Sequence, residues 1–381
     1  MRGYAARMHK AKALGFSLVF LVPAQMPLAA WLGWRTGRPD LMAWTPLVFL
    51  FVLLPLLDGL LGHDPGNVPP EREAAVSRHP WFRALTLLAL PVHLGVLAFS
   101  LAWCTRAGFG PAGVIGWLLS LGVVGGVLAI NVAHELIHKP GRFEPAVGGL
   151  LLASVGYHGF KIEHLRGHHV HVSTPLDASS ARLGQSLWVF MPHALWSNTR
   201  SAWALEAERL HGKGLPWWSP RNDMLRWTAV WLAFAAAAFA WLGGAGLGLF
   251  VAQGLVAAGT LEVINYIEHY GLERRQLADG RYERTTHLHS WNSDFALSNL
   301  MLFQLQRHSD HHAFPKRRYA VLRHHADSPQ LPGGYAAMFV LALFPPLWRR
   351  LIDPRVLAFR RSNAAARGPV APHRADRSAA I

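Results

Sequence analysis

Nine histidines stand in four short clusters along the chain, and their types and spacing predict a metal site. The clusters are His134 and His138; His164, His168 and His169; His269; and His308, His311 and His312. Neutral imidazole is the commonest side-chain ligand of iron, zinc and copper. Each cluster also lies just outside a hydrophobic run. The pattern therefore predicts a polyhistidine metal centre held against the face of a membrane.

The first cluster has a competing interpretation, because residues 134–138 read HELIH and match the zinc protease motif H-E-x-x-H. The i, i+4 spacing places His134 and His138 on one helix face, and Glu135 would be the base. A single zinc site needs only three protein ligands, however, so nine histidines fit two metals with four or five imidazoles each. Neutral ligands leave a strong positive charge on the metals, which favours iron in oxygen chemistry over Mg or Ca.

Membrane helices are the elements that must position these clusters, because the chain of 381 residues is 51% hydrophobic and only 15% charged. A helix of about 20 apolar residues crosses a bilayer. Segments of this length are residues 14–34, 41–62, 84–104, 112–133, 225–243 and 245–267. We expect an all-α membrane protein with six transmembrane helices in one domain over residues 1–354. Residues 355–381 are rich in Ala, Arg and Pro, and we expect a disordered tail there.

The distribution of basic residues predicts the orientation of this domain. Of the 37 Lys and Arg residues, only Arg35, Arg38 and Arg106 fall on one side of the expected topology. By the positive-inside rule the other side is cytoplasmic, and it holds both termini and all four histidine clusters. The same flanks account for the net charge of +15, so we expect no nucleic-acid partner.

The chain contains one cysteine, Cys104, which limits the cofactors that it can carry. A single thiol forms no intramolecular disulfide, no four-cysteine iron–sulfur cluster and no rubredoxin-type centre. An electron-transfer cofactor of that kind must therefore belong to another protein.

The residues around the clusters resemble a known family. The segments HELIHK, EHLRGHH, NYIEHYGL and LQRHSDHHAFPKRRY are similar to the four signatures of membrane-bound alkane 1-monooxygenases, within the integral-membrane histidine-rich di-iron hydroxylases and desaturases. Residues 53–65, 174–184 and 279–294 also look like this family. The resemblance thus covers the chain from the second expected span to about Pro354.

This resemblance implies a non-haem centre of two iron ions, with all nine histidines as ligands and O2 as co-substrate. It implies terminal hydroxylation of medium- or long-chain n-alkanes, taken from the membrane lipid, to 1-alkanols. Electrons would come from NAD(P)H through a separate reductase and a rubredoxin, at a bacterial inner membrane. The alternatives are a fatty-acyl desaturase, a xylene-type hydroxylase or, from a different class, a histidine-rich metal transporter, which should carry its ligands at mid-membrane depth.

Further residues have candidate roles around this centre. Carboxylates and amides that could accept the second N–H of an imidazole are Glu135, Glu163, Asp177, Asn265, Glu268, Asp294 and Asp310. Candidates for the lining of a narrow apolar substrate channel are Leu50, Phe51 and Leu54. Basic residues that could steer an acidic rubredoxin are Lys139, Arg166, Arg307, Lys316, Arg317 and Arg318.

Four other histidines also have expected roles. His287 and His289 form an H-x-H pair, for which we favour structural roles over metal binding. His93 lies inside the third expected span, where a hydrogen bond between helices is the favoured role. His324 is expected to be a surface or interface residue and not to be needed for iron binding or activity.

Overall fold

The computed structural model describes residues 10–367, and all regular elements within that range are helices. The amino-terminal half contains η1 (Phe16–Phe20), α2 (Leu21–Thr36), α3 (Pro39–Met42), α4 (Thr45–Val48), η2 (Phe49–Leu53), α5 (Leu54–Leu61), α6 (Pro70–Arg78), α7 (Pro80–Cys104), α8 (Pro111–Gly125), η3 (Gly126–Ile130), α9 (Asn131–Ile137), α10 (Phe143–Ser154), α11 (Phe160–Glu163), η4 (His164–His168) and α12 (His169–His171). The remainder contains α13 (Leu187–His211), α14 (Asp223–His269), α15 (Ala296–Met301), α16 (His308–Ala313), η5 (Tyr319–Val321), α17 (Tyr335–Ala342) and α18 (Pro345–Arg367).

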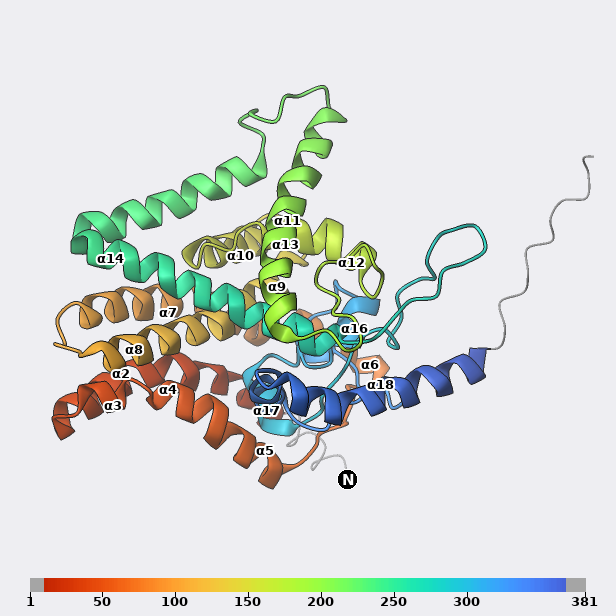
Figure 1. Cartoon of the computed structure of the whole chain (residues 1–381), viewed down its shortest axis with the longest axis horizontal. Helices are drawn as coiled ribbons and strands as arrows, with labels where there is room; N and C mark the ends of the chain where they lie inside the picture. The colour runs from red at the N-terminus through yellow and green to blue at the C-terminus, as the bar shows by residue number, and fades with distance from the viewer. Residues whose placement is uncertain (1–9, 368–381) are drawn as a thin grey trace, which may run out of the picture.

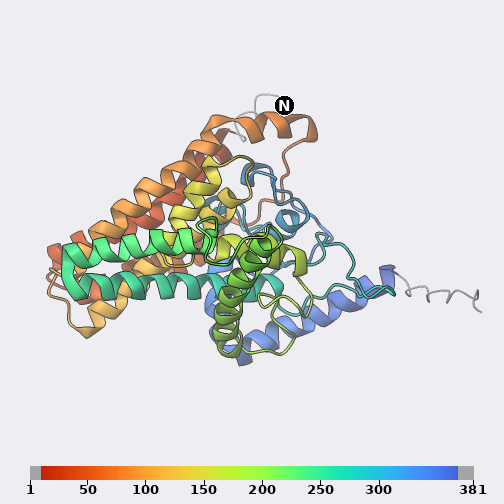
Figure 2. The same cartoon turned by 90° about the horizontal axis from the view of Figure 1, so that it is seen from above.

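Within residues 10–367, five helices are long and apolar enough to cross a membrane, which makes this a multi-pass membrane protein. They span Lys10–Thr36, Pro39–Leu61, Pro80–Cys104, Pro111–Ile137 and Asp223–His269. The last of these, α14, is bent at Gly243, whose φ of 64° and ψ of −156° are not helical. Figures 1 and 2 show that its two arms meet at this bend and run in opposite directions, one beside the other. The arms correspond to the expected spans 225–243 and 245–267, and the total of six crossings stays a prediction.

Glycines on the fourth span permit close contact with the second arm of α14. A Cβ atom added at Gly122 would lie 2.3 Å from the Cβ of Val256, and one added at Gly126 would lie 2.9 Å from Thr260. Such distances are far below van der Waals contact, so larger residues would force the two helices apart. This contact fixes the position of α9 relative to the carboxyl end of α14.

The histidine-bearing elements gather at one end of the helix bundle. Figure 1 shows the bend of α14 and the α7–α8 connection at the left, while α12 and α16 lie at the opposite end. The carboxyl end of α14 reaches the same region as α16. Four segments that are distant in the sequence therefore meet in one layer beyond the apolar helices.

The carboxyl-terminal prediction needs a correction, because residues 355–367 continue α18 and are helical. Trp348, Ile352 and Val356 recur every four residues, and all three are fully buried. The ring of Trp348 packs 5.4 Å from that of Tyr270, which lies directly after α14. This apolar stripe anchors the helix although its composition is rich in Ala and Arg. The rest of the expected disordered tail, residues 368–381, lies outside the described residues.

Candidate metal centre

The nine histidines come together as two adjacent groups. The first group contains His134, His138, His164, His169 and His311, and the second contains His168, His269, His308 and His312. Within each group one nitrogen of every ring lies within 4.8 Å of the corresponding nitrogen of the others. The side chains therefore form one group of five imidazoles and one of four, and each group could bind a metal ion.

A π-helical turn, η4, divides the second cluster between the two groups. The backbone N–H of His169 donates to the carbonyl of His164, which is the i to i+5 bond of a π-helix. Five residues make slightly more than one turn of such a helix, so His164 and His169 lie on nearly the same face. Their Nε2 atoms are 3.0 Å apart, and His168 is left to join the other group.

The Nε2 atoms of several histidines lie too close to one another for hydrogen bonds between the rings to account for all the contacts. Nε2 of His164 lies 3.0 Å from Nε2 of both His138 and His169, and Nε2 of His308 lies 2.9 Å from that of His312. A neutral imidazole nitrogen either donates one bond or accepts one, so it cannot bond to two such neighbours at once. Ligand atoms about 2.1 Å from a shared metal are separated by about 3.0 to 3.4 Å. The residues therefore fit a cation in each group.

Burial supports the same interpretation. Nε2 of His134 and both ring nitrogens of His311 are buried without a hydrogen-bond partner among the described residues. An unsatisfied buried polar atom is costly unless a ligand or water completes it. Burial also holds the pKa values of His164, His308, His311 and His312 well below the usual range, and these imidazoles are therefore neutral, as metal binding requires.

Asp177 makes the contact expected of a carboxylate that orients a metal ligand. Its Oδ2 accepts a bond of 3.0 Å from Nδ1 of His168 and one of 2.6 Å from Ser180. Its Oδ1 accepts from the backbone N–H of Ser179. Burial lowers the pKa of His168, but the contact with Asp177 raises it above the usual value overall. The bond fixes the ring so that Nε2 faces the other histidines.

Glu268 does not lie where a carboxylate that orients a metal ligand is expected. Its Oε2 lies 3.1 Å from Nε2 of His308, which is the nitrogen that faces the other histidines of its group. The carboxyl group therefore stands on the metal side of the ring and not behind it. There it could bind a metal or hold a proton, and it also contacts Tyr335.

Three of the other carboxylate and amide candidates contact residues other than the nine histidines. Glu135 pairs with Lys139 at 2.9 Å, and Asn265 donates to Glu262 at 3.2 Å. Asp310 binds both Arg317, at 2.6 and 2.7 Å, and His325. Burial raises the pKa of Glu163 to about 8, so this carboxyl group is largely protonated at neutral pH.

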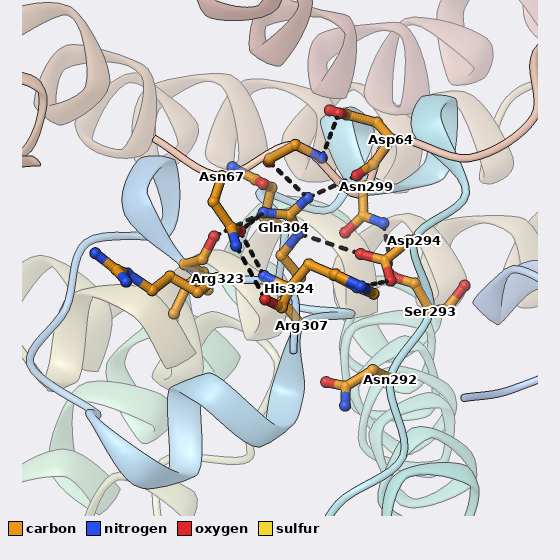
Figure 3. Close-up of polar contacts among 12 residues, drawn as sticks. Asp64, Asn67, Asn292, Ser293, Asp294, Asn299, Gln304, Arg307, Arg323 and His324 are labelled. Atoms are coloured by element: carbon orange, nitrogen blue, oxygen red, sulfur yellow. Dashed lines mark hydrogen bonds and ion pairs between the residues drawn. The ribbon is translucent and has the colours of Figure 1, made fainter. Parts of the chain in front are cut away.

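Asp294 belongs to a separate network around Arg307, which Figure 3 shows. Nδ1 of His324 contacts Asp294 at 2.5 Å, and the guanidinium of Arg307 lies 3.4 Å from the same carboxylate. Arg307 also donates to the backbone carbonyls of Asp64 and Leu322 at 2.7 and 2.8 Å. The network ties the loop after the second span to the residues that flank α16. His324 is thus part of this network and is not a free surface residue.

We expect Arg307→Lys to destabilise the protein by about 2–3 kcal/mol, because an ammonium cannot reproduce the planar set of bonds to several acceptors. Thermal unfolding of the detergent-solubilised protein measures this as a lower melting temperature. Arg281→Lys is the matched control, since the side chain of Arg281 is 82% exposed and pairs with nearby Asp279. Equal melting temperatures for the two variants would contradict the assignment.

The docking role predicted for Lys139, Arg307 and Arg318 is wrong, because these three residues are buried. Lys139 is held by Glu135, and Arg318 donates to Glu144 at 3.0 Å. Their charges are therefore neutralised inside the layer and are not available to another protein. The candidates that reach the surface are Arg166, Lys316 and Arg317. For these three the docking role stays a prediction.

An apolar cavity leads from the membrane helices to the histidines. Leu50, Phe51 and Leu54 of the second span line it, as expected of channel residues. At its inner end it reaches His134 and His164 of the first group and His308 of the second. Further lining residues are Val123, Val127, Phe160, Ile264 and Phe339. The cavity therefore offers an elongated apolar molecule access to both groups at once.

A polar cluster beside the cavity was missed in the sequence. Glu262 is fully buried and accepts hydrogen bonds from the hydroxyl of Tyr157 and the amides of Asn198 and Asn265. An acidic residue inside the apolar span 245–267 was the available signal, because such groups are costly there.

The hydrogen bond predicted for His93 is confirmed, since its Nε2 lies 2.9 Å from the hydroxyl of Ser154.

Comparisons with known proteins agree with this geometry. A sequence model of the fatty acid desaturase family matches residues 109–342. Alkane 1-monooxygenase 2 of Pseudomonas aeruginosa is 50% identical over 93% of this chain and 95% of its own length. Alkane 1-monooxygenase 1 of the same organism is 50% identical over 91% and 92%. Alkane 1-monooxygenase 2 of Alcanivorax borkumensis is 48% identical over 92% and 93%. With such identity over nearly its whole length, the chain belongs to the alkane 1-monooxygenase family.

Proposed function

We propose that this protein hydroxylates the terminal methyl group of medium- or long-chain n-alkanes with O2 and forms 1-alkanols. The observation that carries the proposal is the apolar cavity that ends at both histidine groups. An alkane has no polar group, so the shape of its binding site must select the carbon that reacts. The cavity runs from Leu50 and Leu54 to the histidines, so a chain that enters by one end brings its methyl group to them.

The reaction consumes one O2, two electrons and two protons, and yields the alcohol and one water. Two iron ions, held by the five and the four histidines, would supply the activation of O2 when bound. Asp177 holds His168 with Nε2 toward its group. Leu50 and Leu54 exclude water along the hydrocarbon, and Glu268 holds a proton or a metal beside His308.

The two electrons must come from another protein, because the single cysteine cannot build an iron–sulfur or rubredoxin-type centre. We propose a separate rubredoxin, reduced by an NAD(P)H-dependent reductase. We place both termini and the metal centre on the cytoplasmic side of a bacterial inner membrane, following the positive-inside rule. The alkane would enter the cavity from the bilayer.

The proposal is tested with the purified, iron-loaded protein, rubredoxin, its reductase and NADH. The substrates are octane, hexadecane, xylene and a saturated fatty-acyl thioester, and the products are identified by gas chromatography and mass spectrometry. We expect 1-alkanols from at least one n-alkane. Products from xylene alone, or a desaturated fatty-acyl product without any alkanol, would overturn the proposal in favour of a related enzyme.

Leu50→Ala should shift the preference toward longer alkanes, because Leu50 is buried and lines the cavity. Removing methylene-sized groups from an apolar binding site changes the discrimination between chains by about tenfold. Competition between octane and hexadecane measures the ratio of their kcat/KM values. Leu56→Ala is the matched control, since Leu56 lies on the same span and is 62% exposed. An equal ratio in both variants would contradict the role of Leu50.

A further inference from the structure

A third group of possible metal ligands lies outside the nine histidines. It contains His287, His325 and Asp327, and one ligand atom of each lies within 4.8 Å of the others. His287 comes from the H-x-H pair, whose other member has partners of its own. Nε2 of His289 contacts Glu283 at 3.1 Å, and its Nδ1 accepts from the backbone N–H of Thr286. His287 is therefore the member of the pair that is available to this group.

His325 is held in the manner of a metal-binding histidine. Its Nε2 donates to Oδ1 of Asp310 over 2.9 Å, and Asp310 is fully buried. Asp310 is itself fixed by Arg317 and by the backbone N–H of Arg323. A donated Nε2–H leaves the lone pair on Nδ1 of the same ring. A carboxylate behind a histidine is the usual arrangement that fixes the tautomer and orientation of a metal ligand.

The three side chains are close together and open to solvent. The rings of His287 and His325 stack with centroids 4.4 Å apart and an interplanar angle of 10°. Nε2 of His287 lies 2.8 Å from Oδ2 of Asp327. The exposed fractions of these side chains are 30% for His287, 23% for His325 and 70% for Asp327. A cation can therefore reach the group. Because the two rings are nearly parallel, one of them must turn about its side-chain bonds before both can bind the same ion, and a water molecule can complete the coordination.

The two segments that carry the group are already paired next to it. The backbone N–H of Asn292 donates to the carbonyl of Pro329 at 2.9 Å, and that of Leu331 donates to Asn292 at 2.8 Å. The group thus sits where the loop before α15 meets the loop before α17. A bound ion would join these loops with bonds stronger than the present hydrogen bond between His287 and Asp327.

We propose that His287, His325 and Asp327 bind one divalent transition metal ion, with Zn²⁺ as the best match, separately from the nine-histidine centre. Two imidazole nitrogens, one carboxylate oxygen and an open position are a ligand set that Zn²⁺ accepts, whereas Mg²⁺ and Ca²⁺ prefer oxygen ligands. None of the three residues belongs to either histidine group. The site is therefore independent of the proposed hydroxylase activity.

The test is a zinc titration of the full-length, iron-loaded protein against a coloured zinc chelator, with iron and zinc then measured by mass spectrometry. We expect one zinc per chain to bind while the iron content stays constant. His287→Ala and Asp327→Asn should weaken zinc binding at least about tenfold and leave iron content and alkane oxidation unchanged. His193→Ala, an exposed histidine elsewhere, should bind zinc as the unmodified protein does.

Two results would overturn the proposal. One is zinc binding of equal strength in His287→Ala, Asp327→Asn and the unmodified protein. The other is a loss of iron equal to the zinc gained, which would place the zinc in the nine-histidine centre.

Discussion

Replacing His311 by alanine is expected to remove iron from the protein and to reduce alkane hydroxylation to below about 1% of the unmodified activity. His311 is fully buried, and neither ring nitrogen has a hydrogen-bond partner among the described residues. Its imidazole therefore has no evident structural bond to lose, and its place in the five-histidine group is its evident role. The measurement is iron per chain together with the rate of 1-alkanol formation.

Two matched histidine variants control this experiment. His193→Ala should keep both iron and activity, because His193 is exposed and outside both groups. His324→Ala should keep iron but lower the melting temperature, since His324 contacts Asp294 in the network around Arg307. A His311→Ala protein with the full iron content and full activity would remove His311 from the metal centre.

Asp177→Asn is expected to lower alkane hydroxylation by about 10- to 100-fold and to weaken iron binding in the four-histidine group. In the native protein both carboxylate oxygens accept hydrogen bonds, from His168 and Ser180 on one side and from Ser179 on the other. An amide has only one oxygen, so its NH2 group must face one of these donors. If it faces His168, the proton of the ring moves to Nε2, and that nitrogen can no longer bind a metal.

Asp294→Asn is the control for this second prediction, because Asp294 is also buried and also contacts a histidine. That histidine is His324, which belongs to neither metal group. The control should therefore lose stability and keep its iron. Equal iron content and activity in the two variants would show that Asp177 does not position a ligand.

The sequence was sufficient for the parts of the site that depend on local spacing. The i, i+4 pair His134 and His138 lies in one group because an α-helix places such residues on one face. Apolar length located the spans, and Leu50 and Leu54 line the cavity. The way in which His164, His168 and His169 divide between the groups could not be predicted. It depends on a π-helical turn, which has no simple sequence pattern.

Long-range pairing explains the predictions that were wrong. A count of positive charges places Lys139 and Arg318 on the cytoplasmic side, but it does not show that Glu135 and Glu144 neutralise them in the interior. Composition likewise does not show that Trp348, Ile352 and Val356 form a buried stripe. The aromatic and aliphatic residues at the end of α14 against which they pack are about 80 residues away in the sequence. Both features depend on tertiary contacts that spacing alone does not reveal.

The oxidation of n-octane under ¹⁸O2 by the iron-loaded protein with reduced rubredoxin is the decisive measurement for terminal hydroxylation. We expect 1-octanol that carries one ¹⁸O atom, because the inserted oxygen comes from O2 and the cavity presents the terminal methyl group. We expect no labelled alcohol from the His311→Ala protein. The absence of any labelled 1-alkanol from octane and from longer n-alkanes, despite a full iron content, would rule out the proposed hydroxylation.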